Sequence, residues 1–375
     1  MQAADLAPLY DASGPYVSVY IDTDPAVGNA DQQLESRWRS VREVLAADGA
    51  DDATLDALEK AVRRDTGSQA PAQVLFASGG AVRYSRHLSE ALTRELAVVE
   101  PLPYVTPLLS WAQLRVPHVV VLADRTGADI SAFTDRADAI FTDEVKGSND
   151  EIRRVSPGGW SQMRYQHRAE DSWERNMAEA ADQASRIADA IGAELVLVNG
   201  DIRAVQLFRD HAPKHLARRV EVVESGGGRA KDGSEELVSA EVAEHVLAAA
   251  VAKTTAFLQK FEEERGQNDR ASDGVEATVE ALTRAQVETL LLHDNADDER
   301  KLWFGPDPTL VATERQTLID LGVEEPQQGR LSDVLVRAAV GTGADVRIVL
   351  GTGAAAPTDG VGAVLRFALG DPAAG

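Results

Sequence analysis

Apolar positions along the first part of the chain follow strand and helix periods in turn. The β-branched and aromatic run Tyr16–Ile21 predicts a strand, and apolar residues at helical spacing over 32–47 and 55–62 predict two helices. The apolar run 74–80 predicts a second, buried strand that ends in a glycine turn. Strand, helix, helix, strand is an α/β order, and the closely spaced prolines from Pro101 to Pro107 indicate where this segment ends.

The next segment begins near residue 117 with a hairpin pattern. Two apolar runs, 119–122 and 128–133, flank a turn over 124–127, which predicts paired antiparallel strands. An apolar stripe over 170–191 then predicts a long amphipathic helix that Gly192 ends. Beyond it, the pattern predicts strands at 194–198 and 220–223 and helices at 202–209 and about 235–265.

The last segment again mixes helix and strand patterns. It predicts helices at 275–284 and 331–339 and strands at 287–292, 345–350 and 361–367. The whole pattern predicts an α/β fold in three domains, an N-terminal domain over 1–112, a middle domain over 113–268 and a C-terminal domain over 269–375.

Composition describes an ordinary folded protein with strong acidity. The chain has 375 residues, 44% of them hydrophobic, and a formal net charge of -23. A uniformly acidic surface repels phosphate, so contact with nucleic acid needs local basic patches. Cysteine is absent, which removes disulfides, cysteine metal sites and thiol nucleophiles. The sequence shows no pattern of a membrane helix or signal peptide, and we therefore expect a cytoplasmic protein without a membrane partner.

The most informative feature is a basic, glycine-hinged loop over 156–168. Its Pro-Gly-Gly tip ends in Gly158 and Gly159 and is followed by Trp160, Ser161 and Gln162. Residues 151–168 contain one acidic residue, Glu151, and four arginines: Arg153, Arg154, Arg164 and Arg168. A basic loop with an aromatic residue on an acidic chain favours RNA over a small metabolite. The alternatives are that the tryptophan packs on its own domain and that Arg164 and Arg168 pair with Glu170 or Asp171.

A second basic patch lies over residues 203–219. It contains one acidic residue, Asp210, and five basic residues: Arg203, Arg209, Lys214, Arg218 and Arg219. The same pattern is also typical of a solvated helix face, which is the alternative to a phosphate contact.

In order and spacing, these segments resemble the bacterial branch of the archaeo-eukaryotic class-1 release factor and Pelota superfamily, most closely its actinobacterial, Balon-like members. The resemblance implies a middle domain with a mixed sheet and a protruding tip loop. It also implies a third domain like the C-terminal domain of Pelota and ribosomal protein L7Ae. The segments that carry the resemblance are 16–21 and 74–79 in the first domain, 118–130, 158–162 and 168–191 in the middle domain, and 287–294 and 359–367 in the third.

The catalytic tip of that superfamily is Gly-Gly-Gln, which enters the peptidyl-transferase centre and helps water to attack the peptidyl-tRNA ester. Here Gly158 and Gly159 match the glycines, whereas Trp160 takes the place of the glutamine. An indole offers no carbonyl acceptor and is much bulkier. The resemblance therefore implies a protein that binds the ribosomal A site without hydrolysis, in ribosome hibernation, as in Balon-like proteins, or in stalled-ribosome handling.

Two other functions stay open at this point. One is a ribosome-rescue factor that hydrolyses peptidyl-tRNA through a rearranged loop in which Gln162 substitutes for the missing glutamine. The other is a plain interaction protein on the same fold. An elongation-factor-like GTPase is the partner that is typical of the superfamily.

Motifs for other chemistry are weaker. His211 and His215 have the i,i+4 spacing of a metal pair, but Pro213 lies between them and no third ligand is evident. Gly341–Gly343 and Gly351–Gly353 lack the patterns of a P-loop or a dinucleotide fold.

A hydrolase triad is the remaining catalytic hypothesis. Ser161, His167 and Asp171 supply the residue types, but all three lie close to one loop and no oxyanion hole is evident. We therefore predict no catalytic residue, no cofactor and no metal.

Overall fold

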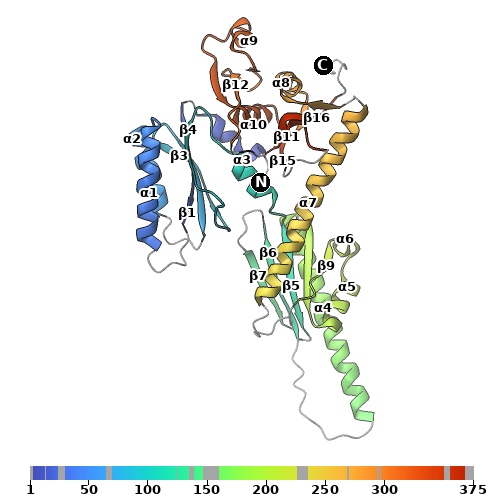
Figure 1. Cartoon of the computed structure of the whole chain (residues 1–375). Coiled ribbons are helices and arrows are strands. Elements are labelled where there is room, and N and C mark those ends of the chain that lie inside the picture. The colour runs from blue at the N-terminus through green and yellow to red at the C-terminus, as the bar shows by residue number, and fades with distance from the viewer. Residues whose placement is uncertain are drawn as a thin grey trace. The chain divides into compact units, whose positions relative to one another are not determined.

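The computed structural model of the chain divides into two compact units. Unit 1 comprises residues 1–113 and 253–375, and unit 2 comprises residues 114–252 (Figure 1). The residues that the structure describes are 3–12, 14–23, 30–64, 70–124, 126–134, 139–146, 160–225, 235–267, 270–293, 295, 297–349 and 355–367.

The N-terminal part of unit 1 is an antiparallel sheet with helices on one face. Its strands, in the order β3-β2-β1-β4, are β1 (Tyr16–Asp22), β2 (Ala72–Ser78), β3 (Ala81–Leu88) and β4 (Leu96–Glu100). Val17, Val19 and Leu75 pack on one face against the helices α1 (Ala30–Ala47) and α2 (Asp52–Arg64). Successive strand residues point to opposite faces, so Tyr16, Tyr20 and Phe76 pack on the other side, in a different core.

The C-terminal part of unit 1 contains two sheets. The larger has the order β10-β16-β11-β15 and only the pair β11–β15 is parallel. The smaller has the order β13-β12-β14. The elements are β10 (Ala271–Asp273), α8 (Val275–Thr283), β11 (Val287–His293), β12 (Lys301–Phe304), β13 (Val311–Ala312), α9 (Arg315–Asp320), β14 (Gln327–Arg330), α10 (Leu331–Gly341), β15 (Asp345–Val349) and β16 (Val361–Leu365).

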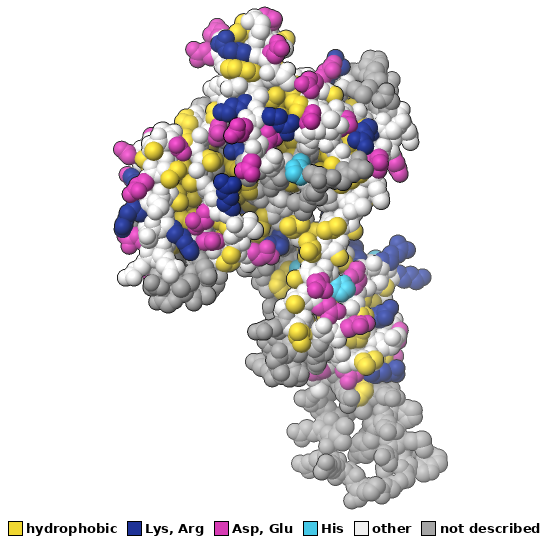
Figure 2. All heavy atoms as spheres, viewed as in Figure 1, with side chains coloured by type: hydrophobic (Ala, Val, Ile, Leu, Met, Phe, Trp, Pro, Cys, Tyr) yellow, Lys and Arg dark blue, Asp and Glu magenta, His cyan; other side chains and the backbone are white. Residues whose placement is uncertain are grey.

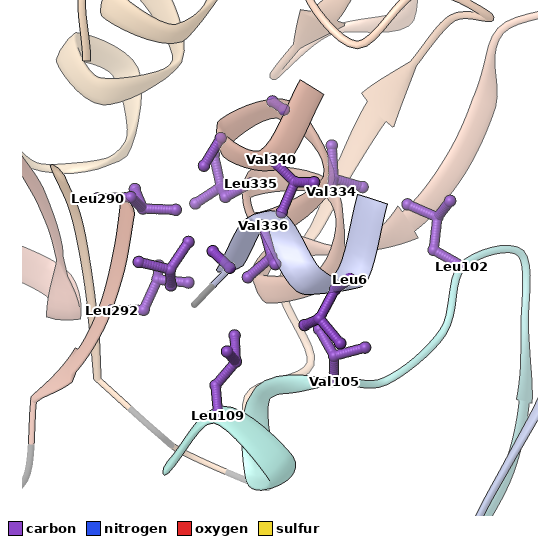
Figure 3. Close-up of a cluster of buried hydrophobic side chains, with 14 of the residues drawn as sticks. Leu6, Leu102, Val105, Leu109, Leu290, Leu292, Val334, Leu335, Val336 and Val340 are labelled. Atoms are coloured by element: carbon purple, nitrogen blue, oxygen red, sulfur yellow. The ribbon is translucent and has the colours of Figure 1, made fainter. Parts of the chain in front are cut away.

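One hydrophobic core joins the two terminal parts of unit 1. Leu6 of the 3-10 helix η1 (Ala3–Tyr10) and Leu109 of α3 (Thr106–Gln113) belong to the same cluster of buried side chains as Val336 and Val340 of α10 (Figure 3). Gln113, at the end of α3, receives a hydrogen bond from Ile348 N at 3.0 Å. Because these contacts merge both parts into one unit, separate N-terminal and C-terminal domains remain a prediction.

Unit 2 is built on a mixed five-stranded sheet in the order β7-β6-β5-β8-β9. The β5–β6 hairpin is antiparallel, whereas β8 runs parallel to both β5 and β9. The predicted hairpin, the mixed sheet and the α/β class are thus confirmed. The strands are β5 (His118–Asp124), β6 (Gly127–Phe133), β7 (Ala139–Lys146), β8 (Leu195–Gly200) and β9 (Val220–Val222).

Helices cover both faces of this sheet. On one face, alternate residues such as Val119 and Val121 pack against Met177 of α4 (Trp160–Ile191) and Phe208 of α5 (Ile202–His211). On the other face, Leu197 packs against the N-terminal half of α7 (Glu235–Gln267). A short helix, α6 (Lys214–Ala217), follows α5. Within the described ranges, no helix is both long and apolar enough to cross a membrane.

Candidate functional site

The Gly-Gly-Trp segment is only partly described by the structure. Arg153, Arg154, Gly158 and Gly159 lie outside the described residues, and so do the side chains of residues 160–172. The predicted contacts of this segment with RNA therefore stay a prediction.

Helix α4 begins at Trp160, ten residues before the start that the sequence predicted. The backbone of five predicted loop residues thus belongs to the first turns of a helix: Trp160, Ser161, Gln162, Arg164 and Arg168. The apolar stripe that predicted the helix starts only at Trp173, and the mostly polar residues before it gave no periodic signal.

The second half of α4 anchors this helix on the sheet of unit 2. Met177, Ala180 and Ala184 are fully buried against β5 and β6. Small alanine side chains let the helix lie close to the strands, and Met177 fills the remaining space. The first turns of α4, which follow the Gly-Gly pair in the sequence, therefore continue into a half of the helix that is packed on the sheet.

Helix α5 presents basic residues because its opposite face is held in the core. The Asp201 carboxylate caps the helix by accepting hydrogen bonds from Arg203 N at 2.9 Å and Ala204 N at 3.4 Å. Val205 and Phe208 are buried on the inner face, so Arg203 and Arg209 are exposed on the outer one.

Two further cations extend this surface onto α6 and the residue after it. Lys214 and Arg218 are exposed, while Leu216 between them is buried. Figure 2 shows dark blue side chains gathered on the side of unit 2 where Figure 1 places α5 and α6. We call Arg203, Arg209, Lys214 and Arg218 the α5–α6 basic surface.

No described residue neutralises the charges of the α5–α6 basic surface. Its four side chains form no hydrogen bond and no ion pair within the described part of the chain. The nearest acid in sequence, Asp210, accepts a hydrogen bond from Gln206 at 2.8 Å instead. Ile202, at the start of α5, is 89% exposed and adds an apolar edge to this surface. Free exposed guanidinium and ammonium groups are suited to phosphate oxygens.

Arg219, the fifth predicted cation, has a different environment. Its Nη1 atom lies 3.2 Å from Asp189 Oδ1 and donates a second hydrogen bond to Ala193 O, also at 3.2 Å. It thereby ties the start of β9 to the end of α4 and the loop behind it. We assign Arg219 to the fold rather than to the α5–α6 basic surface.

The two histidines of the predicted metal pair contact different partners on α4. His211 Nε2 lies 3.4 Å from Glu174 Oε1, and His215 Nε2 lies 2.9 Å from Ser185 Oγ. Among the described residues no group of three or more histidine or acidic side chains could hold a metal ion. The contacts of both histidines serve to pack α5 and α6 on α4.

The structure does not describe the side chains of the predicted triad or the second of the two glycine pairs. The side chains of Ser161, His167 and Asp171 and the segment 351–353 are outside the described residues. Gly343 follows α10 and has a φ of 69°, as expected for the turn that leads into β15.

The sequence analysis did not single out an acidic cluster that fixes the start of α7. Glu241 accepts hydrogen bonds from the backbone N–H groups of Glu224 at 2.9 Å and Ser225 at 2.7 Å. Hydrogen bonds from Ser225 and Glu224 lower the pKa of Glu241 to about 2. His245 Nδ1 lies 2.6 Å from Glu221 Oε2. The i,i+4 spacing of Glu241 and His245 on a predicted helix was the only signal in the sequence.

Comparison with known proteins identifies the middle part of the chain. The model of bacterial archaeo-eukaryotic release factor family 2 matches residues 117–267. The Mycobacterium tuberculosis proteins MT2704 (strain CDC 1551 / Oshkosh) and Rv2629 (strain ATCC 25618 / H37Rv) are 29% identical over 371 residues, which cover 98% of this chain and 97% of theirs.

Solved structures show a looser similarity. Archaeoglobus fulgidus Pelota is 14% identical with a TM-score of 0.37, and the match covers 79% of each chain. Dom34 of S. cerevisiae, a translation termination-like factor, is 12% identical with a TM-score of 0.41 over 80% of each chain. At these values the superpositions are too loose to place individual residues.

The family match confirms the resemblance that the sequence indicated. It covers the hairpin, the Gly-Gly-Trp segment, α4, the α5–α6 basic surface and α7, and so includes most of unit 2 and residues 253–267 of unit 1. Over residues 117–267 the chain is therefore similar to bacterial archaeo-eukaryotic release factor family 2.

Proposed function

We propose that this protein binds the ribosomal A site as a release-factor-like protein that does not hydrolyse peptidyl-tRNA. Its role would lie in ribosome hibernation or in the handling of stalled ribosomes. The observation that carries the proposal is a release-factor family domain with a tryptophan, Trp160, where the superfamily has its catalytic glutamine.

The missing carboxamide supports binding without chemistry. A glutamine side chain offers both a carbonyl acceptor and an amide donor for a water molecule, whereas the indole of Trp160 offers one donor only. An aromatic ring can instead stack on a base, which contributes about 1–3 kcal/mol per base. The same substitution that removes the means of hydrolysis therefore adds a means of holding RNA.

The α5–α6 basic surface supports contact with RNA on a chain that is otherwise acidic. Its four exposed cations have no acidic partner in the described structure, so they remain available to phosphate groups. Local attraction of this kind is needed because the net charge of -23 opposes any non-specific approach to the ribosome.

Co-sedimentation with idle 70S ribosomes tests the proposal. The full chain should pellet with ribosomes at low salt, and a Trp160→Ala variant should bind more weakly. A chain that stays in the supernatant at every salt concentration would contradict the proposal.

A peptide-release assay separates this role from ribosome rescue. Complexes carrying a labelled peptidyl-tRNA should release no more peptide with this protein than with buffer alone. Release above background that is lost in a Gln162→Ala variant would establish the rescue factor instead. Delivery by an elongation-factor-like GTPase belongs to the same proposal and predicts tighter ribosome binding when such a GTPase and GTP are present.

A further inference from the structure

A cavity of about 350 Å³ lies within unit 1, and none of the residues that line it belongs to the segment 117–267 that the family model matches. It is enclosed by the end of η1, the first residues of β1 and the loop that follows β12. Three aromatic side chains line it, those of Tyr10, Tyr16 and Phe304. The volume is at the lower end of the range, roughly 300–1,000 Å³, that small-molecule sites occupy.

Arg337 of α10 lines this cavity as a buried cation without an acidic partner. Only 7% of the residue is exposed, and its guanidinium lies 5.3 Å from the centre of the Phe304 ring. It donates hydrogen bonds to Pro306 O and, at 3.5 Å, to Asp307 O. No carboxylate of the described residues lies within ion-pair distance of it. Burying a charge without a counter-ion is costly, so an anion bound beside Arg337 would stabilise it.

Two carboxyl groups near Arg337, those of Asp333 and Asp307, form no ion pair with it. Asp333, one turn earlier on α10, is fully buried, and burial raises its pKa well above the ordinary value, which favours the neutral form. Asp307 is exposed, and its Oδ1 accepts hydrogen bonds from Thr309 N at 2.8 Å and Thr309 Oγ1 at 2.6 Å. Its carboxylate is therefore held by its own loop, and it attracts Arg337 without forming an ion pair.

The hydroxyl of Tyr10 is a second unused donor at the cavity. Its oxygen is buried and has no hydrogen-bond partner among the described residues. Burial raises the pKa of Tyr10 well above its ordinary value, so the hydroxyl keeps its proton. A buried donor that is left without an acceptor costs about 1–3 kcal/mol, which a ligand oxygen would recover.

We propose that this cavity binds a small organic anion with a planar apolar body and a single carboxylate or phosphate group. The anionic group accepts hydrogen bonds from Arg337 and from Tyr10 Oη, while the planar body packs against Tyr16 and Phe304. Asp11 and Glu325 line the cavity and are exposed, so they repel polyanions such as an RNA strand. The ligand is thus a small molecule rather than nucleic acid.

Benzoate and phenyl phosphate are suitable probes, since they share a planar ring and differ in the anionic group. Benzamide is the uncharged control. With the full chain at constant ionic strength, we expect at least one anion to raise Tm by roughly 3 to 6 °C at ten times its dissociation constant. Benzamide should leave Tm unchanged. The proposal fails if neither anion shifts Tm or produces heat in calorimetry, or if benzamide binds as tightly.

Variants test whether the bound anion lies against the two donors. Arg337→Met should weaken binding at least about tenfold, as expected for loss of a hydrogen bond to a charged group. Because that change also removes the contacts with Pro306 and Asp307, Tyr10→Phe provides a second arm that deletes only one hydroxyl and should weaken binding roughly threefold to tenfold. The assignment of the anion to Arg337 and Tyr10 would be overturned by two results together. These are an unchanged affinity of Tyr10→Phe for the probes and an unchanged affinity of a folded Arg337→Met.

Arg347→Met is the matched control for both variants. Arg347 belongs to the same unit and also lies over an aromatic ring, 4.6 Å from the centre of Phe257. Its charge, however, is paired with Asp345 at 3.5 Å, and it does not line the cavity. Binding of the probes should be the same in this variant as in the wild-type chain, and a tenfold loss there would contradict the proposal.

Discussion

Neutralising the α5–α6 basic surface should lower the salt dependence of ribosome binding without unfolding the protein. The perturbation replaces Arg203, Arg209, Lys214 and Arg218 together by glutamine. All four side chains are exposed and have no ion-pair partner among the described residues, so each change should alter the free energy of unfolding by no more than about 0.5 kcal/mol.

The size of the expected effect follows from counterion release. Each phosphate contact contributes about 0.7 to 0.9 to the slope of log affinity against log salt concentration. Four contacts therefore contribute roughly 3 to the slope. Between 50 and 200 mM salt, the affinity of the wild-type chain should fall roughly 50- to 150-fold further than that of the variant.

A matched control separates this local effect from the change in net charge. Arg42, Arg94, Lys260 and Arg284 are cations of unit 1, and each is paired with an acid, at 2.8, 3.7, 3.2 and 2.6 Å respectively. Replacing these four by glutamine changes the net charge by the same amount, yet it should leave the salt slope unchanged. Binding to 70S ribosomes would be titrated by co-sedimentation at three salt concentrations. Equal slopes for the wild-type chain and both variants would refute the reasoning.

Further predictions concern the elements that position this surface. Gly200 has a φ of 141°, and a Cβ there would lie 1.8 Å from Ala123 O, so Gly200→Ala should destabilise unit 2 by about 2 to 6 kcal/mol in thermal unfolding. A Gly200→Ala chain with wild-type Tm would contradict that contact. Asp201→Ala removes the cap of α5 and should cost about 0.5 to 2 kcal/mol, measured by denaturant unfolding, whereas Asp201→Asn should cost less. The pKa of Glu241 falls from 4.5 to about 2 on folding, so its contribution to stability is complete above pH 4.5 and is lost as the pH falls toward about 2. The difference in Tm between the wild-type chain and Glu241→Gln should therefore shrink over that pH range, and a difference that stays constant would show that Glu241 does not hold α7.

Periodic patterns predicted the buried elements better than the half-buried ones. Strands β1, β2 and β5 were predicted because their apolar residues run together or alternate cleanly. Strand β3 was missed because polar residues interrupt its sequence, AVRYSRHL. Strand β4, LAVVE, was missed because it is short and all five of its residues are only partly buried. Their place in the sheet comes from pairing with β2 and β1, which a local pattern cannot reveal.

For a similar reason, the sequence could not predict that the two terminal parts of the chain form one unit. Leu6 and Val334 are apolar in the sequence, but the pattern does not say which segments they contact. In the structure they share one core although more than three hundred positions separate them. Contacts over that separation depend on tertiary packing alone.

The basic patch shows the same limit at the level of single side chains. The sequence presents Arg218 and Arg219 as equivalent neighbours. The structure separates them, because Asp189 on α4 pairs with Arg219 at 3.2 Å and leaves Arg218 exposed. For the Gly-Gly-Trp segment, the predicted contacts with RNA rest on the sequence alone. The structure adds only that α4 begins at Trp160.

Cryo-electron microscopy of the full chain bound to idle 70S ribosomes tests the central claim most directly. The account predicts the protein in the A site, with Trp160 against an rRNA base near the peptidyl-transferase centre and the α5–α6 basic surface facing rRNA phosphates. A chain bound elsewhere, or one in the A site with that surface turned to solvent and Trp160 packed on its own unit, would contradict it.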